Sequence, residues 1–281
     1  MKPTPEISEV KVSIIITTKD EARHIATCLR SVKSQNYPPD KLEIIVVDNN
    51  STDETKAIAS RFTTKVFNLG PERSAQRNFG VAESSGRYIL YLDADMTLQP
   101  EVLRECCRKC EEEGWVGAYI PEKITGTGFW IKARDFERGF YNATVIDCVR
   151  FVKKEVFEEI DGFDESLNGP EDWDFDRRIR EVGPTGIIDA CLYHDEGGFN
   201  LFGYAAKKRY YARGFSRYID KWGRKEPVIR KQFGVFYRYF GVFIEEGKWK
   251  RLLAHPRLTI GMYLLRFAVG LVFIYSRYFK R

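Results

Sequence analysis

The sequence predicts an α/β protein with a mostly parallel central sheet flanked by helices. Short apolar runs rich in β-branched residues alternate four times with segments of helical periodicity, which is typical of parallel strands joined by crossover helices. The runs lack alternating polar residues, as expected for strands buried on both faces. Polar clusters follow three of the runs, at the sheet edge where open α/β proteins bind ligands.

The first 96 residues contain four predicted strands and three predicted helices. The strands are 11–17 (KVSIIIT), 42–47 (LEIIVV), 66–67 (VF) and 87–92 (RYILYL). The helix predicted at 21–34 has apolar residues at helical spacing. A second helix is expected to begin near Thr52, because Thr or Asp there can cap it, and a third covers 74–84.

The middle of the chain is less regular. Its predicted elements are strands at 116–120 and 149–152, a mobile loop at 126–130 and a helix at 154–160. Pro170 suits the first turn of a further helix, on which Phe175 and Ile179 share an apolar face. We expect Asp174 and Asp176 on this helix to face solvent or to pair with the arginines beside them.

Charge is distributed unevenly along the chain. Of the 45 Lys and Arg residues, 19 lie from Lys207 onward, whereas only 4 of the 40 Asp and Glu residues do. The hydrophobic content of 43% excludes a disordered chain. The basic, aromatic C-terminal part therefore predicts contact with an anionic surface, such as phospholipid, a phosphate-bearing acceptor or nucleic acid.

We expect residues 223–281 to form a basic amphipathic helical tail that associates with a membrane. The apolar stretch at 233–244 is too short to span a bilayer. The stretch at 258–275 is near the lower limit for a span, but Arg266 interrupts it at a cost of about 2.5–3.5 kcal/mol on insertion scales. Helices lying in the membrane interface are therefore favoured over a crossing helix.

The cysteines and the N-terminus favour a cytosolic chain. The six cysteines include a CxxC at Cys107 and Cys110, but no second pair completes a zinc site, so we expect reduced thiols. The first ten residues have no apolar core, so no secretory signal is expected.

The polar clusters at the strand ends are 17–21 (TTKDE), 48–50 (DNN) and 93–95 (DAD). In a parallel sheet these ends converge on one edge. The two carboxylates of the third cluster suit a hard divalent cation, which takes only one or two protein carboxylates when phosphates and waters supply the other ligands. A solvated turn is the alternative for the third cluster, and a turn with a helix cap is the alternative for the second.

Four segments of the chain resemble the family 2 glycosyltransferases. They are VSIIITTKDEARHIATCLRSVKSQ, LEIIVVDNNSTDET, PERSAQRNFGVAESSGRYILYLDADM and GPEDWDFDRRI, and the resemblance covers about residues 10–196. It implies the GT-A fold, a Rossmann-like fold of nucleotide-diphospho-sugar transferases. It also implies an inverting enzyme of the hexosyltransferase class that contains a DxD motif and uses Mg²⁺ or Mn²⁺.

By this resemblance, the nucleotide-sugar site consists of Thr17, Thr18, Asp20, Glu21, Asp48, Asn50, Arg77, Asp93, Ala94, Asp95 and Glu171. Asp48 matches the aspartate that contacts the base. Arg77 matches the arginine of the family's A-R-N segment, which here reads QRN. A surface helix charge is the alternative for Arg77.

The resemblance also implies the metal ligands and the general base. Asp95 matches the direct metal ligand, and Asp93 faces the ribose or metal-bound water. His194 is a candidate third metal or phosphate ligand, although a structural or acceptor-side role is equally open. Asp172 matches the catalytic base, and a single carboxylate base with in-line attack gives inversion at the anomeric carbon.

The resulting prediction is a GT-A catalytic domain at 1–222, with the nucleotide-sugar part at about 10–96 and the acceptor side at 97–222, followed by the tail. The donor is a nucleotide sugar, with UDP favoured over GDP or dTDP. The acceptor is a hydroxyl of a glycan or of a polyprenyl-linked intermediate. The enzyme is expected to be peripheral or monotopic on the cytoplasmic face of the membrane, with no nucleic acid as partner.

Three other functions are weighed against this one. An oxidoreductase on a dinucleotide-binding sheet is excluded because no GxGxxG follows the first strand. A sugar nucleotidyltransferase usually has a Gly-rich basic loop after the first strand, where this chain is acidic. A non-catalytic module that binds nucleotides or nucleic acid through the basic tail remains the alternative from another class.

Overall fold

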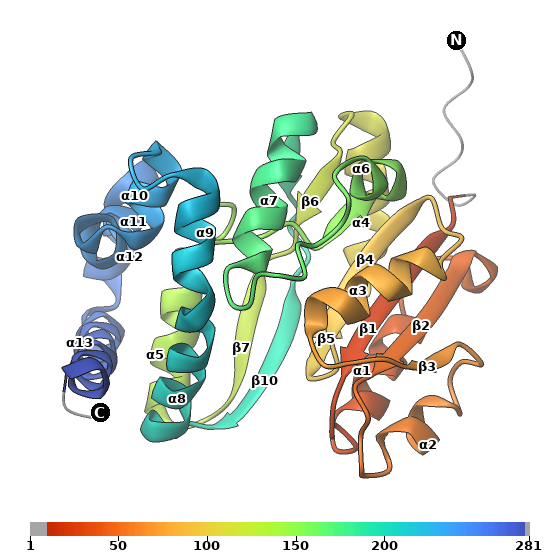
Figure 1. Ribbon diagram of the computed structural model, residues 1–281, viewed down its shortest axis with the longest axis horizontal. Coiled ribbons are helices and arrows are strands. Elements are labelled where there is room, and N and C mark those ends of the chain that lie inside the picture. The colour runs from red at the N-terminus through yellow and green to blue at the C-terminus, as the bar shows by residue number, and fades with distance from the viewer. Residues whose placement is uncertain (1–9, 279–281) are drawn as a thin grey trace. The chain divides into compact units, whose positions relative to one another are not determined.

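The structure is a computed structural model that describes residues 10–278, with side chains described as far as residue 271 (Figure 1). The chain forms two compact units. The first comprises residues 10–122, 147–166 and 171–194, and the second comprises 123–146, 167–170 and 195–278. The predicted boundary at residue 222 separates a catalytic domain from a membrane-associating tail. The division into two units does not test these roles, so this boundary stays a prediction.

The first unit contains a seven-stranded, mostly parallel sheet, as predicted. Its strand order is β3 (Val66–Asn68), β2 (Leu42–Asp48), β1 (Val12–Thr18), β4 (Tyr88–Asp93), β8 (Phe151–Lys153), β6 (Gly117–Tyr119) and β9 (Thr185–Ile187). β1 pairs in parallel with both β2 and β4, whereas β8 is antiparallel to β4 and β6. A three-stranded sheet follows the order β5 (Met96–Leu98), β10 (Leu192–Gly198) and β7 (Glu122–Thr127).

Helices cover both faces of the seven-stranded sheet, which explains why its central strands are mostly apolar on both faces. The helices of this unit are α1 (Ile25–Lys33), α2 (Thr55–Ala59), α3 (Arg73–Ala82), α4 (Val102–Glu112), α6 (Lys154–Glu159) and α7 (Glu171–Val182). In β1, Ile14 and Ile16 belong to the core formed with α1 and α4, while Ile15 belongs to the core formed with α3, α6 and α7. Successive side chains of a strand point to opposite faces, so a strand covered on both sides is apolar at most of its positions.

Two predicted boundaries differ from the structure. α2 begins at Thr55, after the predicted start, and Asp53 accepts the backbone N–H of Thr55 at 3.0 Å. The backbone N–H of Thr52 binds Asp20 at 2.8 Å in the turn before the helix. The mobile loop predicted at 126–130 is wrong, since β7 and then α5 (Phe129–Arg138) occupy that segment. A Cβ on Gly126 would lie 2.1 Å from the carbonyl oxygen of Gly197, so this glycine permits a close backbone approach.

The expectation that Asp174 and Asp176 face solvent is wrong as well. Asp174 is fully buried and pairs with Arg178 at 2.9 Å, which is the alternative predicted for it. Asp176 is buried and accepts the backbone N–H of Val149 at 3.1 Å. Both lie on α7, whose apolar face also includes the buried Phe175 and Ile179 as predicted.

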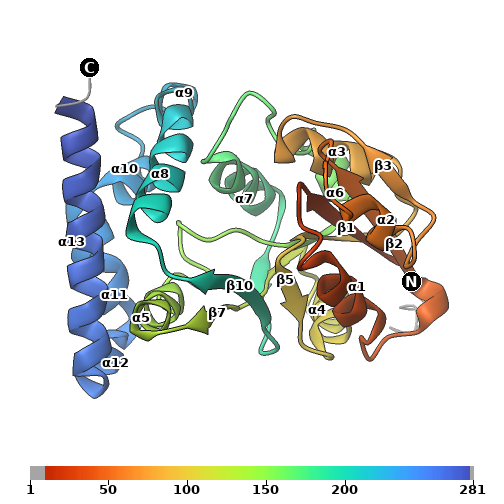
Figure 2. The same ribbon diagram turned by 90° about the horizontal axis from the view of Figure 1, so that it is seen from below.

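The second unit is helical after β10, as predicted for the C-terminal part of the chain. Its longer helices are α5, α8 (Leu201–Tyr211), α9 (Phe215–Trp222), α10 (Pro227–Phe233) and α13 (Pro256–Tyr278), and its shorter ones are η3 (Ala212–Gly214), η4 (Tyr237–Gly241), α11 (Val242–Ile244), η5 (Glu245–Gly247) and α12 (Trp249–Ala254). α13 packs against α5 and α12, as Figure 2 shows. Within the described part of the chain, none of the helices has both the length and the apolar character needed to cross a bilayer.

Arg266 faces the interior of this unit. Its guanidinium donates hydrogen bonds to Glu137 on α5, to the backbone carbonyl of Arg238, and to the hydroxyl of Tyr141 at 2.6 Å. The side chains of Arg266 and Glu137 are each 9% exposed. The charge that interrupts the apolar stretch at 258–275 is therefore neutralised inside the protein, and this pairing fixes which face of α13 is exposed.

Candidate active site

The three predicted polar clusters lie together at one edge of the seven-stranded sheet. The strand register places Thr17 beside Asp93 and Thr18 beside Asp48. β1, β2 and β4 are parallel and adjacent, so their carboxyl ends meet at this edge. The predicted convergence is thus present in the fold, and it brings threonine hydroxyls and carboxylates from separate loops within reach of one another.

The loops after β1 and β2 are tied together by hydrogen bonds. Asp48 is fully buried and accepts the backbone N–H of Ser51 at 2.7 Å as well as its hydroxyl. The hydroxyl of Ser51 in turn accepts the backbone N–H of Asp20 at 2.8 Å. Asp20 has a φ of 52°, in the left-handed region that Asp tolerates better than most residues. Asp48 therefore builds the turn that the sequence offered as an alternative, and its contact with a base stays a prediction.

The other residues predicted on the nucleoside side have defined positions. The carboxylate of Glu21 lies 2.7 Å from Nδ1 of His24. Asn50 has a φ of 53° and exchanges hydrogen bonds with Asn68. The hydroxyl of Thr18 is buried and has no hydrogen-bond partner among residues 10–271. That unsatisfied hydroxyl at a strand end is available to a polar ligand.

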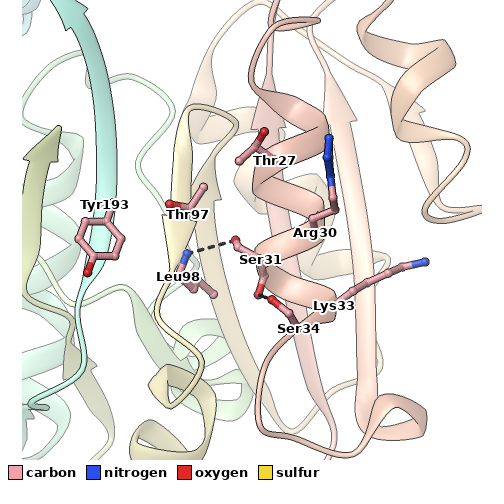
Figure 3. Close-up of a pocket in the computed structure, with 8 residues that line it drawn as sticks. All are labelled: Thr27, Arg30, Ser31, Lys33, Ser34, Thr97, Leu98 and Tyr193. Atoms are coloured by element: carbon pink, nitrogen blue, oxygen red, sulfur yellow. Dashed lines mark hydrogen bonds between the residues drawn. The ribbon is translucent and has the colours of Figure 1, made fainter. Parts of the chain in front are cut away.

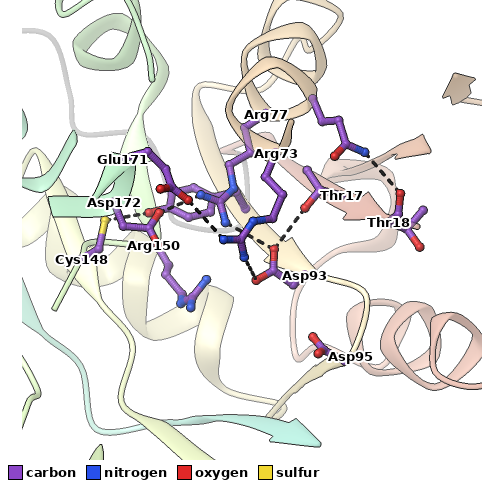
Figure 4. Close-up of polar contacts among 12 residues, drawn as sticks. Thr17, Thr18, Arg73, Arg77, Asp93, Asp95, Cys148, Arg150, Glu171 and Asp172 are labelled. Atoms are coloured by element: carbon purple, nitrogen blue, oxygen red, sulfur yellow. Dashed lines mark hydrogen bonds and ion pairs between the residues drawn. The ribbon is translucent and has the colours of Figure 1, made fainter. Parts of the chain in front are cut away.

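Asp93 lies at the centre of a group of cationic side chains (Figure 4). One carboxylate oxygen of Asp93 accepts hydrogen bonds from Thr17 at 3.1 Å and from Arg77 at 3.3 Å, and the other lies 3.5 Å from Arg73. Burial acts to raise the pKa of Asp93, but the charges of Arg73, Arg77 and Arg150 outweigh it and hold the pKa well below its usual range. Asp93 is therefore ionised at neutral pH.

Arg77 connects the DxD segment to the first turn of α7. It is 1% exposed and donates to Asp172 at 2.7 Å as well as to Asp93. Its guanidinium carbon lies 4.6 Å from the ring centre of Tyr91 and 5.0 Å from that of Phe163. Burial acts to lower the pKa of Arg77, but the charges of Asp172 and Asp93 outweigh this effect and raise the pKa above its usual value. The alternative of a surface helix charge is excluded for this residue.

Glu171 and Asp172 begin α7 and differ in exposure. The side chain of Glu171 is 3% exposed, and one of its oxygens lies 3.2 Å from Arg73 while the other has no partner within the described chain. Burial and the neighbouring Asp172 charge raise the pKa of Glu171. The side chain of Asp172 is 31% exposed. Of these two carboxylates, Asp172 is the one that an incoming molecule can reach.

Asp95 and His194 lie close to each other, although they are far apart in the sequence. Nε2 of His194 is 3.1 Å from one oxygen of Asp95, and Nδ1 is 2.9 Å from Glu122. Burial acts to lower the pKa of His194, but the hydrogen bonds to Asp95 and Glu122 raise it to about 10. The second oxygen of Asp95 is buried and has no hydrogen-bond partner in the described residues, and Ala94 beside it is buried too.

These two side chains fit a divalent cation that is shared with a phosphate ligand. In the part of the chain that the structure describes, no three His, Cys, Asp or Glu side chains converge on a common metal position. Mg²⁺ usually takes one or two protein carboxylates and completes its shell with phosphates and water, and imidazole suits Mn²⁺ less than oxygen but is tolerated. The unpartnered oxygen of Asp95 beside the imidazole of His194 provides such a partial ligand set.

Three charged residues of the site were not predicted from the sequence: Arg73, Glu122 and Arg150. Arg73 lies four residues before Arg77, so helical spacing within ERSAQRN could have identified it. Glu122 on β7 and Arg150 before β8 have no local signal, because only the sheet order brings them together.

A separate shallow depression of about 600 Å³ lies over α1 and β5 (Figure 3). Its lining residues are Thr27, Arg30, Ser31, Lys33, Ser34, Thr97, Leu98 and Tyr193. None of these residues belongs to the cluster around Asp93, so the depression is distinct from the candidate active site.

Comparisons with known proteins agree with the fold and identify the family. The family model described as glycosyl transferase family 2 matches residues 13–161. Glycosyltransferase AglE of Haloferax volcanii is 31% identical over 243 residues, which cover 80% of this chain and 78% of that protein. Of the 281 residues, more than half fall within the family match.

Solved structures of similar fold are glycosyltransferases as well. The mannosyltransferase PcManGT from Pyrobaculum calidifontis, in complex with GDP-Man and Mn²⁺, has a TM-score of 0.65 at 18% identity and covers 99% of this chain and 90% of its own. S. aureus TarS 1-349, in complex with UDP-GlcNAc, has a TM-score of 0.56 at 19% identity and covers 92% and 81%. The chain spans 49% of another, longer TarS structure.

The fold is that of the GT-A glycosyltransferases, and the protein is an enzyme of that class. The chain belongs to glycosyl transferase family 2. This membership sets aside the nucleotidyltransferase and the non-catalytic binding module that were weighed against it on the sequence.

Proposed function

We propose that the enzyme transfers a sugar, with inversion, from a nucleotide-diphospho-sugar to a hydroxyl group, with Asp172 as general base. The observation that carries this proposal is the position of Asp172. Its carboxylate is 31% exposed, and Arg77 links it to Asp93 at the strand edge. A carboxylate within about 2.6–3.2 Å of an acceptor hydroxyl can remove its proton during attack.

Arg77 prepares Asp172 for this role. The guanidinium holds one oxygen of Asp172 at 2.7 Å, which fixes the orientation of the carboxylate. The other oxygen remains for the acceptor hydroxyl. Because Arg77 also binds Asp93, the base and the donor side of the site are held in one geometry.

The donor diphosphate develops negative charge as its bond to the sugar breaks. Arg73 lies 3.5 Å from Asp93 and 3.2 Å from Glu171, where its 35% exposed side chain can turn to a phosphate. We propose that Asp95, Asp93 and His194 hold Mg²⁺ or Mn²⁺, which supplies Lewis-acid stabilisation of the leaving diphosphate when bound. Thr17, Thr18, Asp20, Glu21, Asp48 and Asn50 are proposed to surround the nucleoside.

The donor is proposed to be UDP-linked, as the sequence favours. The two structural neighbours were solved with a UDP sugar and with a GDP sugar, so the shared fold accommodates either nucleotide. The acceptor is proposed to be a glycan or a polyprenyl-linked intermediate at the cytoplasmic face of a membrane. The C-terminal helices support this part of the proposal, because α13 exposes Ile260, Leu264, Phe267 and Leu271 in a stripe at helical spacing.

A donor-hydrolysis screen tests the reaction. UDP-, GDP- and dTDP-sugars are incubated with the full chain and Mn²⁺ or Mg²⁺, and the released nucleotide is measured. Asp172→Asn is expected to lower transfer by at least a hundredfold while leaving donor binding within about twofold. Glu181→Gln, at the exposed end of the same helix, is the matched control and should keep full activity. Equal activity of Asp172→Asn and the control would reject Asp172 as the base.

A further inference from the structure

A series of contacts between four charged side chains extends from Asp95 to Arg150, which lies directly before β8. Asp95 contacts His194 at 3.1 Å, His194 contacts Glu122 at 2.9 Å, and Glu122 contacts Arg150 at 3.3 Å. The four residues come from different parts of the sequence, and all of them lie in the first compact unit. This series of contacts forms because the fold brings distant segments together, and no local sequence motif encodes it.

The two ends of this series of contacts have unsatisfied polar atoms. One oxygen of Asp95 and Nη1 of Arg150 are buried and have no hydrogen-bond partner within residues 10–271. An unsatisfied buried charged group is destabilising, so its presence needs an explanation. At the Asp95 end, a bound cation would satisfy the free oxygen. At the Arg150 end, the charges of Glu122, Asp93 and Asp172 act on the guanidinium and raise its pKa against the effect of burial.

The orientation of a histidine ring depends on what binds each of its two nitrogens. In metal sites, a carboxylate at one ring nitrogen fixes the tautomer and turns the other nitrogen to the metal. Glu122 occupies this position at Nδ1 of His194, and it is itself only 9% exposed. Arg150, 12% exposed, compensates the buried charge of Glu122 and holds its second oxygen.

We propose that Glu122 and Arg150 are positioning residues that hold Nε2 of His194 beside Asp95, so that these two side chains bind a divalent cation together. This inference rests on the proposed metal assistance. A purely structural ion-pair network is the competing explanation, because buried charge networks also occur away from active sites. The two explanations differ in what they predict for metal affinity.

Glu111 provides a matched control for Glu122. It is also a buried glutamate, 6% exposed, and it is held by an aromatic hydroxyl and an arginine, at 2.7 Å from Tyr88 and 3.1 Å from Arg87. These partners lie at the opposite end of β4 from Asp93. Glu111→Gln therefore removes the same kind of buried charge without touching the proposed metal ligands.

The experiment measures Mn²⁺ binding to the 281-residue chain by electron paramagnetic resonance, with UDP present, and UDP binding in EDTA by calorimetry. Glu122→Gln is expected to weaken Mn²⁺ binding by about 10–100-fold, the range found for residues that orient metal ligands. UDP binding in EDTA should stay within about twofold. Arg150→Met should weaken Mn²⁺ binding as well, and Arg150→Lys should restore part of it.

The outcomes separate the inference from the proposed function. If Glu122→Gln and Glu111→Gln bind Mn²⁺ as tightly as the wild type, or lose the same small amount, the network is structural and the inference is overturned. If the wild type itself binds no Mn²⁺ in the presence of UDP, the proposed metal assistance fails and the inference fails with it. Should Glu122→Gln fail to fold, the difference between Arg150→Lys and Arg150→Met decides the question by the same measurement.

Discussion

Arg77 donates a 2.7 Å hydrogen bond to Asp172 while a second nitrogen of the same guanidinium lies 3.3 Å from Asp93. One buried cation thus joins the candidate base on α7 to the acidic end of β4. The rings of Tyr91 and Phe163 enclose the guanidinium. This relationship makes the geometry of the base dependent on the donor side of the site.

Replacing Arg77 should therefore affect stability and activity together. Arg77→Gln leaves Asp93 and Asp172 without their shared cation, and breaking a buried pair in this way typically costs about 3–5 kcal/mol. Chemical denaturation should show a loss of this size, and transfer activity should fall at least a hundredfold. Arg178→Gln, which breaks the Asp174 pair on the same helix, should cost stability with a smaller effect on activity.

Asp95→Ala tests the proposed cation site. We expect the variant to bind UDP more weakly in the presence of Mn²⁺ and to lose the difference between Mn²⁺ and EDTA, because the metal no longer links protein to diphosphate. Calorimetry with UDP under both conditions measures this difference. An undiminished Mn²⁺ effect on UDP binding would contradict the role of Asp95. Asp189→Ala, a carboxylate outside the cluster, serves as the control.

Asp176 makes stability depend on pH. Burial raises the pKa of this carboxyl to about 7. The hydrogen bond from the N–H of Val149 acts to lower the pKa, but its effect is smaller than that of burial. The unfolded carboxyl titrates near 3.9, so the folded state holds the proton more tightly, and the stabilisation present below pH 4 is lost as pH rises to about 7. The loss is at most on the order of 4 kcal/mol.

Asp176→Asn should remove this pH dependence, because the amide stays neutral and can still accept the N–H of Val149. Urea unfolding at pH 5 and pH 8 should show that the variant gains stability relative to the wild type at the higher pH. A constant difference between the two proteins across this range would show that Asp176 does not titrate there.

The exposed stripe on α13 should govern binding to membranes. Leu264 and Leu271 are 56% and 67% exposed, and Arg266 between them faces inward. Burying a Leu side chain contributes about 1.5–3 kcal/mol, so Leu264→Gln with Leu271→Gln should lower binding to anionic vesicles by about tenfold or more. Co-sedimentation with anionic and neutral vesicles measures this.

Ile187→Gln on β9 removes an exposed apolar side chain elsewhere and is the control for the stripe. Equal sedimentation of the double variant and the wild type would contradict a membrane role for α13. Binding that does not differ between anionic and neutral vesicles would contradict the electrostatic part of the proposal, because basic residues attract anionic headgroups.

Local sequence patterns were sufficient to predict the sheet and the edge at which polar residues gather. The strands at 11–17, 42–47 and 87–92 were predictable because strands buried on both faces are apolar at most of their positions, and this pattern is local. The loops that follow them could be placed at one edge because parallel strands end on the same side. The helical nature of the C-terminal part was predicted from its two apolar stretches and its excess of basic residues.

The pairing of the charged residues, in contrast, became known only from the packing of distant elements in the fold. Glu122, Arg150 and His194 have no spacing that relates them, since strand order rather than sequence distance brings them together. The environment of Arg77 was equally hidden, because its burial depends on rings from β4 and from the segment before α7. The physical reason is that periodicity encodes which face of an element is buried, whereas charge pairing depends on how distant elements pack.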